Sequence, residues 1–110
     1  MARRVRIEEN FRRDVAARVR WLAEHRPPSE RANLRAALMV FGQRVALHPG
    51  IGAEIERRGP SSYRLFTIGR HLPYLVWYTY DVEDLTGPVS LLMLLHEAQD
   101  RERFDADRFD

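Results

Sequence analysis

The chain has 110 residues, no cysteine and a formal net charge of +2, from 18 basic and 16 acidic residues. Without cysteine it can form neither a disulfide bridge nor a thiolate metal site, and no apolar run approaches the ~20 residues that span a membrane. Its length fits one domain with a modest core, and we expect a cytoplasmic protein with no membrane partner.

The first half of the sequence predicts a short strand and a helical hairpin. Alternating apolar residues place the strand at residues 4–7. Asn10 is the predicted N-cap of a helix whose apolar residues step by four, four and three: Phe11, Val15, Val19 and Leu22. Pro27 and Pro28 end this helix. Ser29 is the predicted cap of a second helix with apolar residues at steps of four, three and four: Leu34, Leu38, Phe41 and Val45.

The second half predicts three strands. Residues 62–68 alternate, so Tyr63 and Leu65 share one face while Arg64, Phe66 and Ile68 share the other. A turn at 69–71 leads to an aromatic, β-branched run at 74–80. After a polar loop at 81–88, residues 89–95 are apolar apart from Ser90, which is typical of a strand covered on both faces.

The order of elements is β-α-α-β-β-β, which predicts an α+β domain over residues 1–110. We expect the helical hairpin to pack on a largely antiparallel four-stranded sheet. Residues 97–110 form an acidic C-terminal extension, expected to be a short helix or a tail. Glu54 and Glu56 fall in a stretch interpreted as a solvated loop.

The charge is unevenly distributed along the chain. Residues 1–35 hold ten arginines and five acidic residues, whereas residues 97–110 hold three arginines and six acidic residues. Proteins that bind rRNA or duplex DNA usually carry a larger net surplus, because neutralised phosphates supply much of their affinity. Direct nucleic-acid binding is therefore not expected.

Three segments resemble the toxins of the RelE/ParE superfamily, the toxic half of bacterial type II toxin–antitoxin pairs. They are residues 47–52 (LHPGIG), 63–71 (YRLFTIGRH) and 94–101 (LLHEAQDR), and the resemblance covers roughly residues 5–104. It implies two alternatives on one fold, which the fold cannot separate. RelE-type toxins cut mRNA on the ribosome, whereas ParE-type toxins block DNA gyrase.

The nuclease alternative would use His96 as base, with Arg64 and Arg70 on the phosphate. Two residues that the resemblance leads us to expect are absent. Leu75 occupies the place of a recurring third-strand arginine, and no tyrosine follows Tyr80. The last strand is instead followed by carboxylates that would repel RNA: Glu97, Asp100, Glu102 and Asp105. We also expect a packing role for Arg64, with its guanidinium bound to a carboxylate or a backbone carbonyl.

The sequence thus favours a ParE-like toxin that acts by binding a target such as DNA gyrase and is neutralised by a cognate antitoxin. This hypothesis assigns no catalytic residue and no cofactor. The four histidines are too far apart in sequence to form a zinc pair, so no metal site is expected. The predicted partner-binding residues are Arg12, Arg13, Arg20, His96, Arg101 and Arg103.

Overall fold

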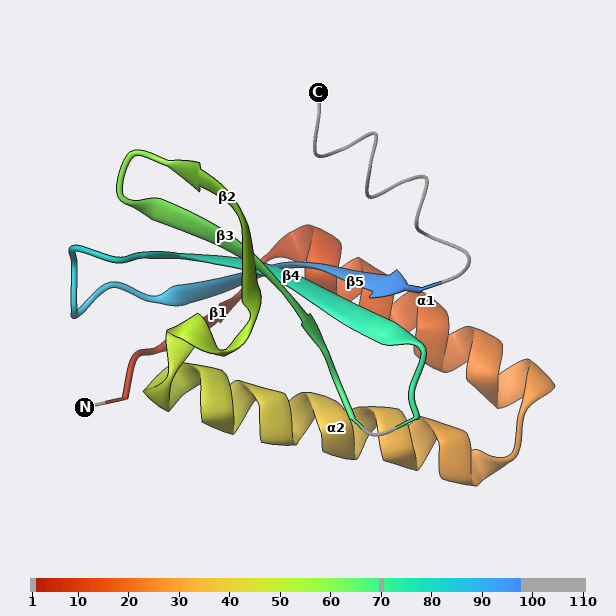
Figure 1. Ribbon diagram of the computed structural model, residues 1–110. Coiled ribbons are helices and arrows are strands. Elements are labelled where there is room, and N and C mark those ends of the chain that lie inside the picture. The colour runs from red at the N-terminus through yellow and green to blue at the C-terminus, as the bar shows by residue number, and fades with distance from the viewer. Residues whose placement is uncertain (1, 70, 98–110) are drawn as a thin grey trace.

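The computed structural model describes residues 2–69 and 71–97 (Figure 1). Its elements are β1 (Val5–Ile7), α1 (Glu9–His25), α2 (Pro28–Leu47), the short 3-10 helix η1 (Pro49–Ile51), β2 (Ala53–Arg58), β3 (Ser61–Thr67), β4 (Tyr74–Asp81) and β5 (Val89–His96). The two long helices form a hairpin against one sheet, which confirms the predicted α+β class. The expected helix or tail after residue 97 lies outside the described residues.

The sheet has five strands in the order β1-β5-β4-β3-β2, so the predicted number of four is wrong. It is also mixed. Strand β1 pairs in parallel with β5, through Val5 with Val89 and Ile7 with Leu91, and the other neighbours pair antiparallel. Strand β5 therefore lies inside the sheet between β1 and β4, in agreement with its largely apolar sequence.

The strand that sequence reasoning missed is β2, at the edge of the sheet. Four of its six residues are charged, and a β-bulge between Glu54 and Glu56 breaks the alternation that would have revealed it. Charged side chains suit an edge strand because they discourage pairing with other chains. Glu54 and Glu56 thus belong to a strand rather than a loop, and Glu54 accepts hydrogen bonds from Arg57 and Ser62.

Both helices begin two residues earlier than their predicted caps imply. Helix α1 starts at Glu9 because the backbone N–H of Glu8 already donates to Leu91 of β5. Helix α2 starts at Pro28, whose fixed φ and missing N–H suit the first helical position. Asn10 and Ser29 therefore lie inside the first turns rather than at the caps.

The sheet buries apolar residues on both faces, but the two helices cover only one. On the helix side the core contains Phe11, Leu22, Leu34, Phe41 and Val45 with their neighbours from β4 and β5. A second cluster on the other face contains Trp77, Met93 and Leu95. Phe66 packs on the first cluster and Tyr63 and Leu65 on the second, which confirms the predicted faces of β3.

The C-terminal end of α2 is tied to the middle of the sheet by a group of hydrogen bonds that we call the turn lock. Tyr78 is fully buried; its hydroxyl donates to Pro49 O at 2.6 Å and accepts from Gly52 N at 2.9 Å. Arg64 donates to the carbonyls of Gly50 at 3.0 Å and Gly52 at 2.6 Å. A Cβ on residue 52 would lie 2.9 Å from the Tyr78 hydroxyl oxygen, so this close approach requires glycine.

Helix α1 is held by a separate polar contact. Asp14 accepts a hydrogen bond at 3.1 Å from the backbone N–H of Leu94, on the half of β5 that extends beyond β1. The carboxylate thus satisfies an N–H that the short strand β1 does not reach. No helix in the described part of the chain is long and apolar enough to cross a membrane.

Replacing Tyr78 with phenylalanine should lower the free energy of unfolding by about 1–3 kcal/mol, because a buried N–H and a partly buried C=O each lose their partner. Urea denaturation of the purified protein measures this. The matched control is Tyr63→Phe, which removes a hydroxyl that forms no hydrogen bond with a described residue. Equal stability of the two variants would contradict the assigned role of the turn lock.

The same tyrosine makes stability depend on alkaline pH. Burial raises the pKa of the Tyr78 phenol above its ordinary value of 10.0. The unfolded chain therefore loses this proton first, and the free energy of unfolding should fall as pH rises from about 10. Denaturation midpoints between about pH 8 and about pH 11 should decline less steeply in Tyr78→Phe than in the wild-type protein.

Candidate functional site

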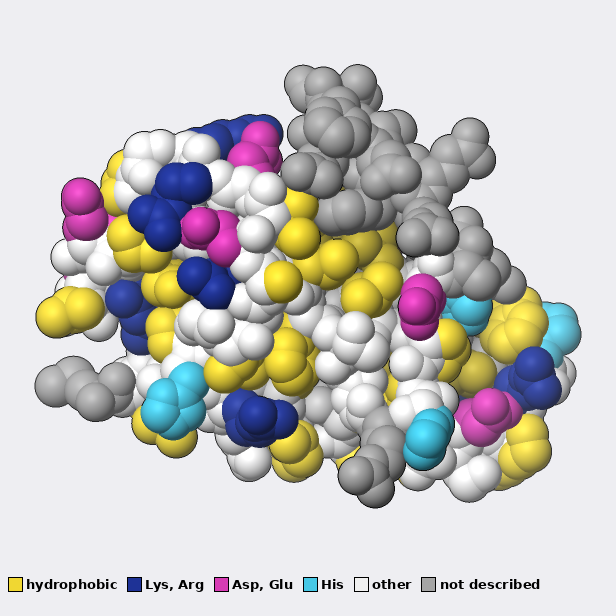
Figure 2. All heavy atoms as spheres, viewed as in Figure 1, with side chains coloured by type: hydrophobic (Ala, Val, Ile, Leu, Met, Phe, Trp, Pro, Cys, Tyr) yellow, Lys and Arg dark blue, Asp and Glu magenta, His cyan; other side chains and the backbone are white. Residues whose placement is uncertain are grey.

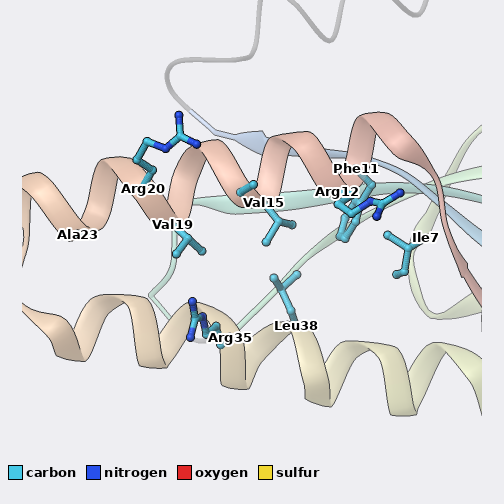
Figure 3. Close-up of a pocket in the computed structure, with 10 residues that line it drawn as sticks. Ile7, Phe11, Arg12, Val15, Val19, Arg20, Ala23, Arg35 and Leu38 are labelled. Carbon is cyan, nitrogen blue, oxygen red and sulfur yellow. The ribbon is translucent and has the colours of Figure 1, made fainter.

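A groove of about 540 Å³ runs between α1 and α2, and we call it the hairpin groove. Figure 3 shows Val15 and Val19 of α1 and Leu38 of α2 pointing toward one another across it. Its apolar lining is Ile7, Phe11, Val15, Ala16, Val19, Ala23 and Leu38, and its basic lining is Arg12, Arg20 and Arg35. The molecule therefore presents an apolar channel edged by cations.

The groove follows from the way in which the helices pack. Helix α1 packs mainly on β5, whereas the end of α2 is fixed by the turn lock at η1. The helices therefore lie close to the sheet but do not close fully on each other. Side chains from the same apolar stripe that builds the core, such as Val15 and Val19, are left partly exposed between them.

The basic residues at the groove differ in how they are neutralised. Arg12 donates to Glu9 at 2.6 Å, and Arg13 lies 3.4 Å from the same carboxylate. Neither Arg20 nor Arg35 forms an ion pair with any described residue. An acidic side chain of a partner would therefore meet two cations that have no counter-ion within residues 2–69 and 71–97.

The predicted partner-binding residues do not form a single surface. Arg12 and Arg20 line the hairpin groove, but Arg13 does not, and His96 lines a different pocket. Arg101 and Arg103 lie outside the described residues. Sequence reasoning missed Arg35, although its position one residue after Leu34 and three before Leu38 places it beside the apolar stripe of α2.

Of the residues in the nuclease alternative, Arg64 uses its Nε and Nη1 donors within the protein. Its guanidinium binds the two glycine carbonyls of the turn lock, and its Nε donates to Ser62 Oγ at 3.0 Å. It also lies over the ring of Tyr80. These contacts confirm the expected packing role with backbone carbonyls as acceptors. Arg70 lies outside the described residues.

His96 lines a polar pocket of about 300 Å³ at the far end of the hairpin. Its ring stands edge-on to Tyr74 with the centroids 5.5 Å apart, and burial raises the pKa of that phenol. Other polar residues that line this pocket are Arg18, Arg26, Glu30 and His71. His71 has a left-handed backbone, with φ of 65°, in the turn before β4.

The structure does not bring His96 and Arg64 together. Arg64 pairs with Tyr78 and His96 pairs with Tyr74, four residues away along β4. At ~3.3 Å per residue this offset is about 13 Å, and the two strands lie a further ~10 Å apart across β4. A single phosphate held by Arg64 therefore lies out of reach of the imidazole.

Among the described residues, no group of three or more histidine, aspartate or glutamate side chains is arranged to hold a metal ion. Several carboxylates in the described part of the chain make other contacts. Glu54 binds Ser62 and Arg57, and the hydrogen bond from Ser62 is the main cause that lowers its pKa.

No family model and no curated protein matches the chain. Among solved structures, a chain of the archaeal RelE–RelB complex from Pyrococcus horikoshii OT3 superposes with a TM-score of 0.55. The two sequences are 15% identical, and the match covers 90% of this chain and 99% of the other. The protein therefore has the fold of that chain along almost its whole length.

Proposed function

We propose that the protein is the toxin of a type II toxin–antitoxin pair, that it acts ParE-like by binding and inhibiting a target such as DNA gyrase, and that a cognate antitoxin neutralises it. The observation that carries the proposal is the hairpin groove, with its apolar floor and its cations. This surface suits protein binding, and nothing in it provides a nucleophile or a proton-transfer pair.

Two likenesses support the toxin assignment. Two of the three segments that resemble RelE/ParE toxins belong to one structural unit here, since residues 49–52 and Arg64 meet in the turn lock. The fold is also that of a chain solved as part of a RelE–RelB complex. Both likenesses favour a partner protein for this chain, although a shared fold alone does not determine an activity.

The chemistry of the groove favours an amphipathic helix as the neutralising segment. An apolar channel between two helices accepts residues spaced by three and four along such a helix. Arg20 and Arg35, which have no ion-pair partner among the described residues, favour carboxylates on its flanks. A disordered acidic segment that folds on binding would satisfy both requirements.

Binding is favoured over cleavage because the nuclease residues are not assembled. Arg64 donates from Nη1 to both glycine carbonyls of the turn lock, and Leu75 stands where the resemblance leads us to expect an arginine. The alternative, a RelE-like ribosome-dependent mRNA endonuclease, keeps one observation in its favour. The polar pocket is lined by His96 and His71 together with Arg18 and Arg26. The experiment must therefore include a variant in this pocket.

The two functions separate in a pair of assays with the purified chain. The proposal predicts inhibition of gyrase supercoiling and intact mRNA in a reconstituted translation reaction. Cleavage of translated mRNA that disappears in His96→Ala would instead establish the nuclease. His96→Ala is the better probe than Arg64→Ala, because loss of Arg64 also disrupts the turn lock.

Charge reversal at the groove tests the neutralising partner. The double variant Arg20→Glu with Arg35→Glu should bind the antitoxin at least about tenfold more weakly at low salt, because attraction becomes repulsion at two rim positions. Isothermal titration calorimetry measures this affinity. Since both side chains are exposed, the free energy of unfolding should change by less than about 1 kcal/mol.

The matched control is Arg57→Glu with Arg58→Glu on β2, which reverses the same charge far from the groove. Its affinity for the antitoxin should remain within about twofold of that of the wild-type protein. Equal losses in both double variants would show that general charge, rather than the hairpin groove, governs the interaction.

A further inference from the structure

The side of α2 that faces away from the core carries a row of exposed, uncharged residues, which we call the α2 stripe. At 3.6 residues per turn the row spans an arc of about 100°, opposite the buried Leu34 and Phe41. Its members are Ala32, Ala36, Met39, Val40, Gln43 and Leu47. Figure 1 shows this helix along the outside of the molecule, with the sheet and α1 on its other sides.

The stripe is unusually apolar for a solvent-exposed helix surface. Met39, Val40 and Leu47 expose 67%, 51% and 58% of their surface and make up half of the six exposed large hydrophobic residues among those described. Figure 2 shows hydrophobic side chains at the surface along the lower edge, over α2. A single exposed leucine is ordinary, but apolar residues gathered on one helix face mark an interface. Helix α2 thus has the pattern of a helix that is covered on two sides.

We propose that a second copy of this chain covers the α2 stripe, in a two-fold symmetric pair of antiparallel α2 helices. The axis passes between Met39 and Val40, so that these residues of both copies meet at the centre. In this register each small residue faces a larger one of the other copy: Ala36 faces Gln43, and Ala32 faces Leu47. The stripe is therefore complementary to itself, as a two-fold interface requires.

A shallow hollow beside the stripe supports this fit. It has a volume of about 440 Å³ and lies between α2 and β3, lined by Ala36, Ala37, Val40, Phe41, Arg44, Phe66, Thr67 and Gly69. The small side chains near its Ala36 end leave room for Leu47 of the second copy. The pair can therefore bury apolar surface beyond the helix ridge alone.

The charges around the stripe favour a second copy over an acidic partner. No member of the stripe is charged. The nearest cations lie on opposite sides of it, since Arg35 lines the hairpin groove and Arg44 lines the hollow. In the antiparallel pair each arginine remains at the solvent rim. The interface centre is then free of charge, so salt should not weaken it.

Sedimentation velocity of the purified full chain, from about 1 μM to about 500 μM, tests the proposal. The wild-type protein should pass from 12.9 kDa to twice that mass, with a dissociation constant that stays the same or falls in 0.5 M NaCl. Met39→Glu and Val40→Glu should each raise the dissociation constant at least about tenfold, because a carboxylate is brought to the apolar centre. Leu85→Ser, at an 80% exposed loop position, is the control and should change nothing.

Cysteine cross-linking tests the register, since the chain has no cysteine of its own. The double variant Ala36→Cys with Gln43→Cys should form a disulfide-linked dimer on mild oxidation. Each single variant should not, because equivalent residues of the two copies lie about 10 Å apart along the helices. Circular dichroism verifies that every variant is folded.

A wild-type protein that remains a monomer throughout this concentration range would overturn the proposal. So would a dimer that persists in Met39→Glu and Val40→Glu, or one that dissociates in 0.5 M NaCl. None of these outcomes depends on the proposed toxin function, because the α2 stripe and the hairpin groove lie on different sides of α2. Charge reversal at Arg20 should leave dimerisation intact.

Discussion

The hydrogen bonds that Tyr78 and Arg64 make to residues 49–52 fix the position of α2, and the surfaces of the protein follow from that position. Tyr78 lies on the central strand of the sheet and is fully buried, so it ties the end of a twenty-residue helix to the core of the fold. If this end moved, the gap to α1 and the hollow beside β3 would both change. The hairpin groove and the α2 stripe thus depend on one buried phenol and one guanidinium.

The same constraint explains two segments that are far apart in sequence. The run LHPGIG supplies two carbonyls and a glycine that admits a close approach, while YRLF supplies the arginine that binds those carbonyls. An arginine satisfies this geometry because its planar fork presents several donors to separate acceptors at once. Arg64 therefore has a structural role that accounts for its presence without any contact to a phosphate.

Sequence reasoning succeeded where burial is one-sided and regular. The period of Phe11, Val15 and Val19 gave α1, and the alternation of β3 gave both of its faces. It failed for β2, because an edge strand with a bulge and four charged residues has no buried period. It also could not place β1 beside β5, since strand pairing depends on contacts between segments that are distant in the chain.

Helix α2 shows why the candidate site was predicted only in part. Its residues are divided among three surfaces: Leu34, Phe41 and Val45 face the core, Arg35 and Leu38 face the hairpin groove, and Met39 and Val40 face outward. Apolar residues therefore occur on every side of α2. An interpretation that assigns the helix a single apolar face misses both Arg35 and the α2 stripe. A charged partner can use the groove while an uncharged one uses the stripe. Salt should consequently act on the two contacts in opposite directions, weakening the first and leaving or strengthening the second.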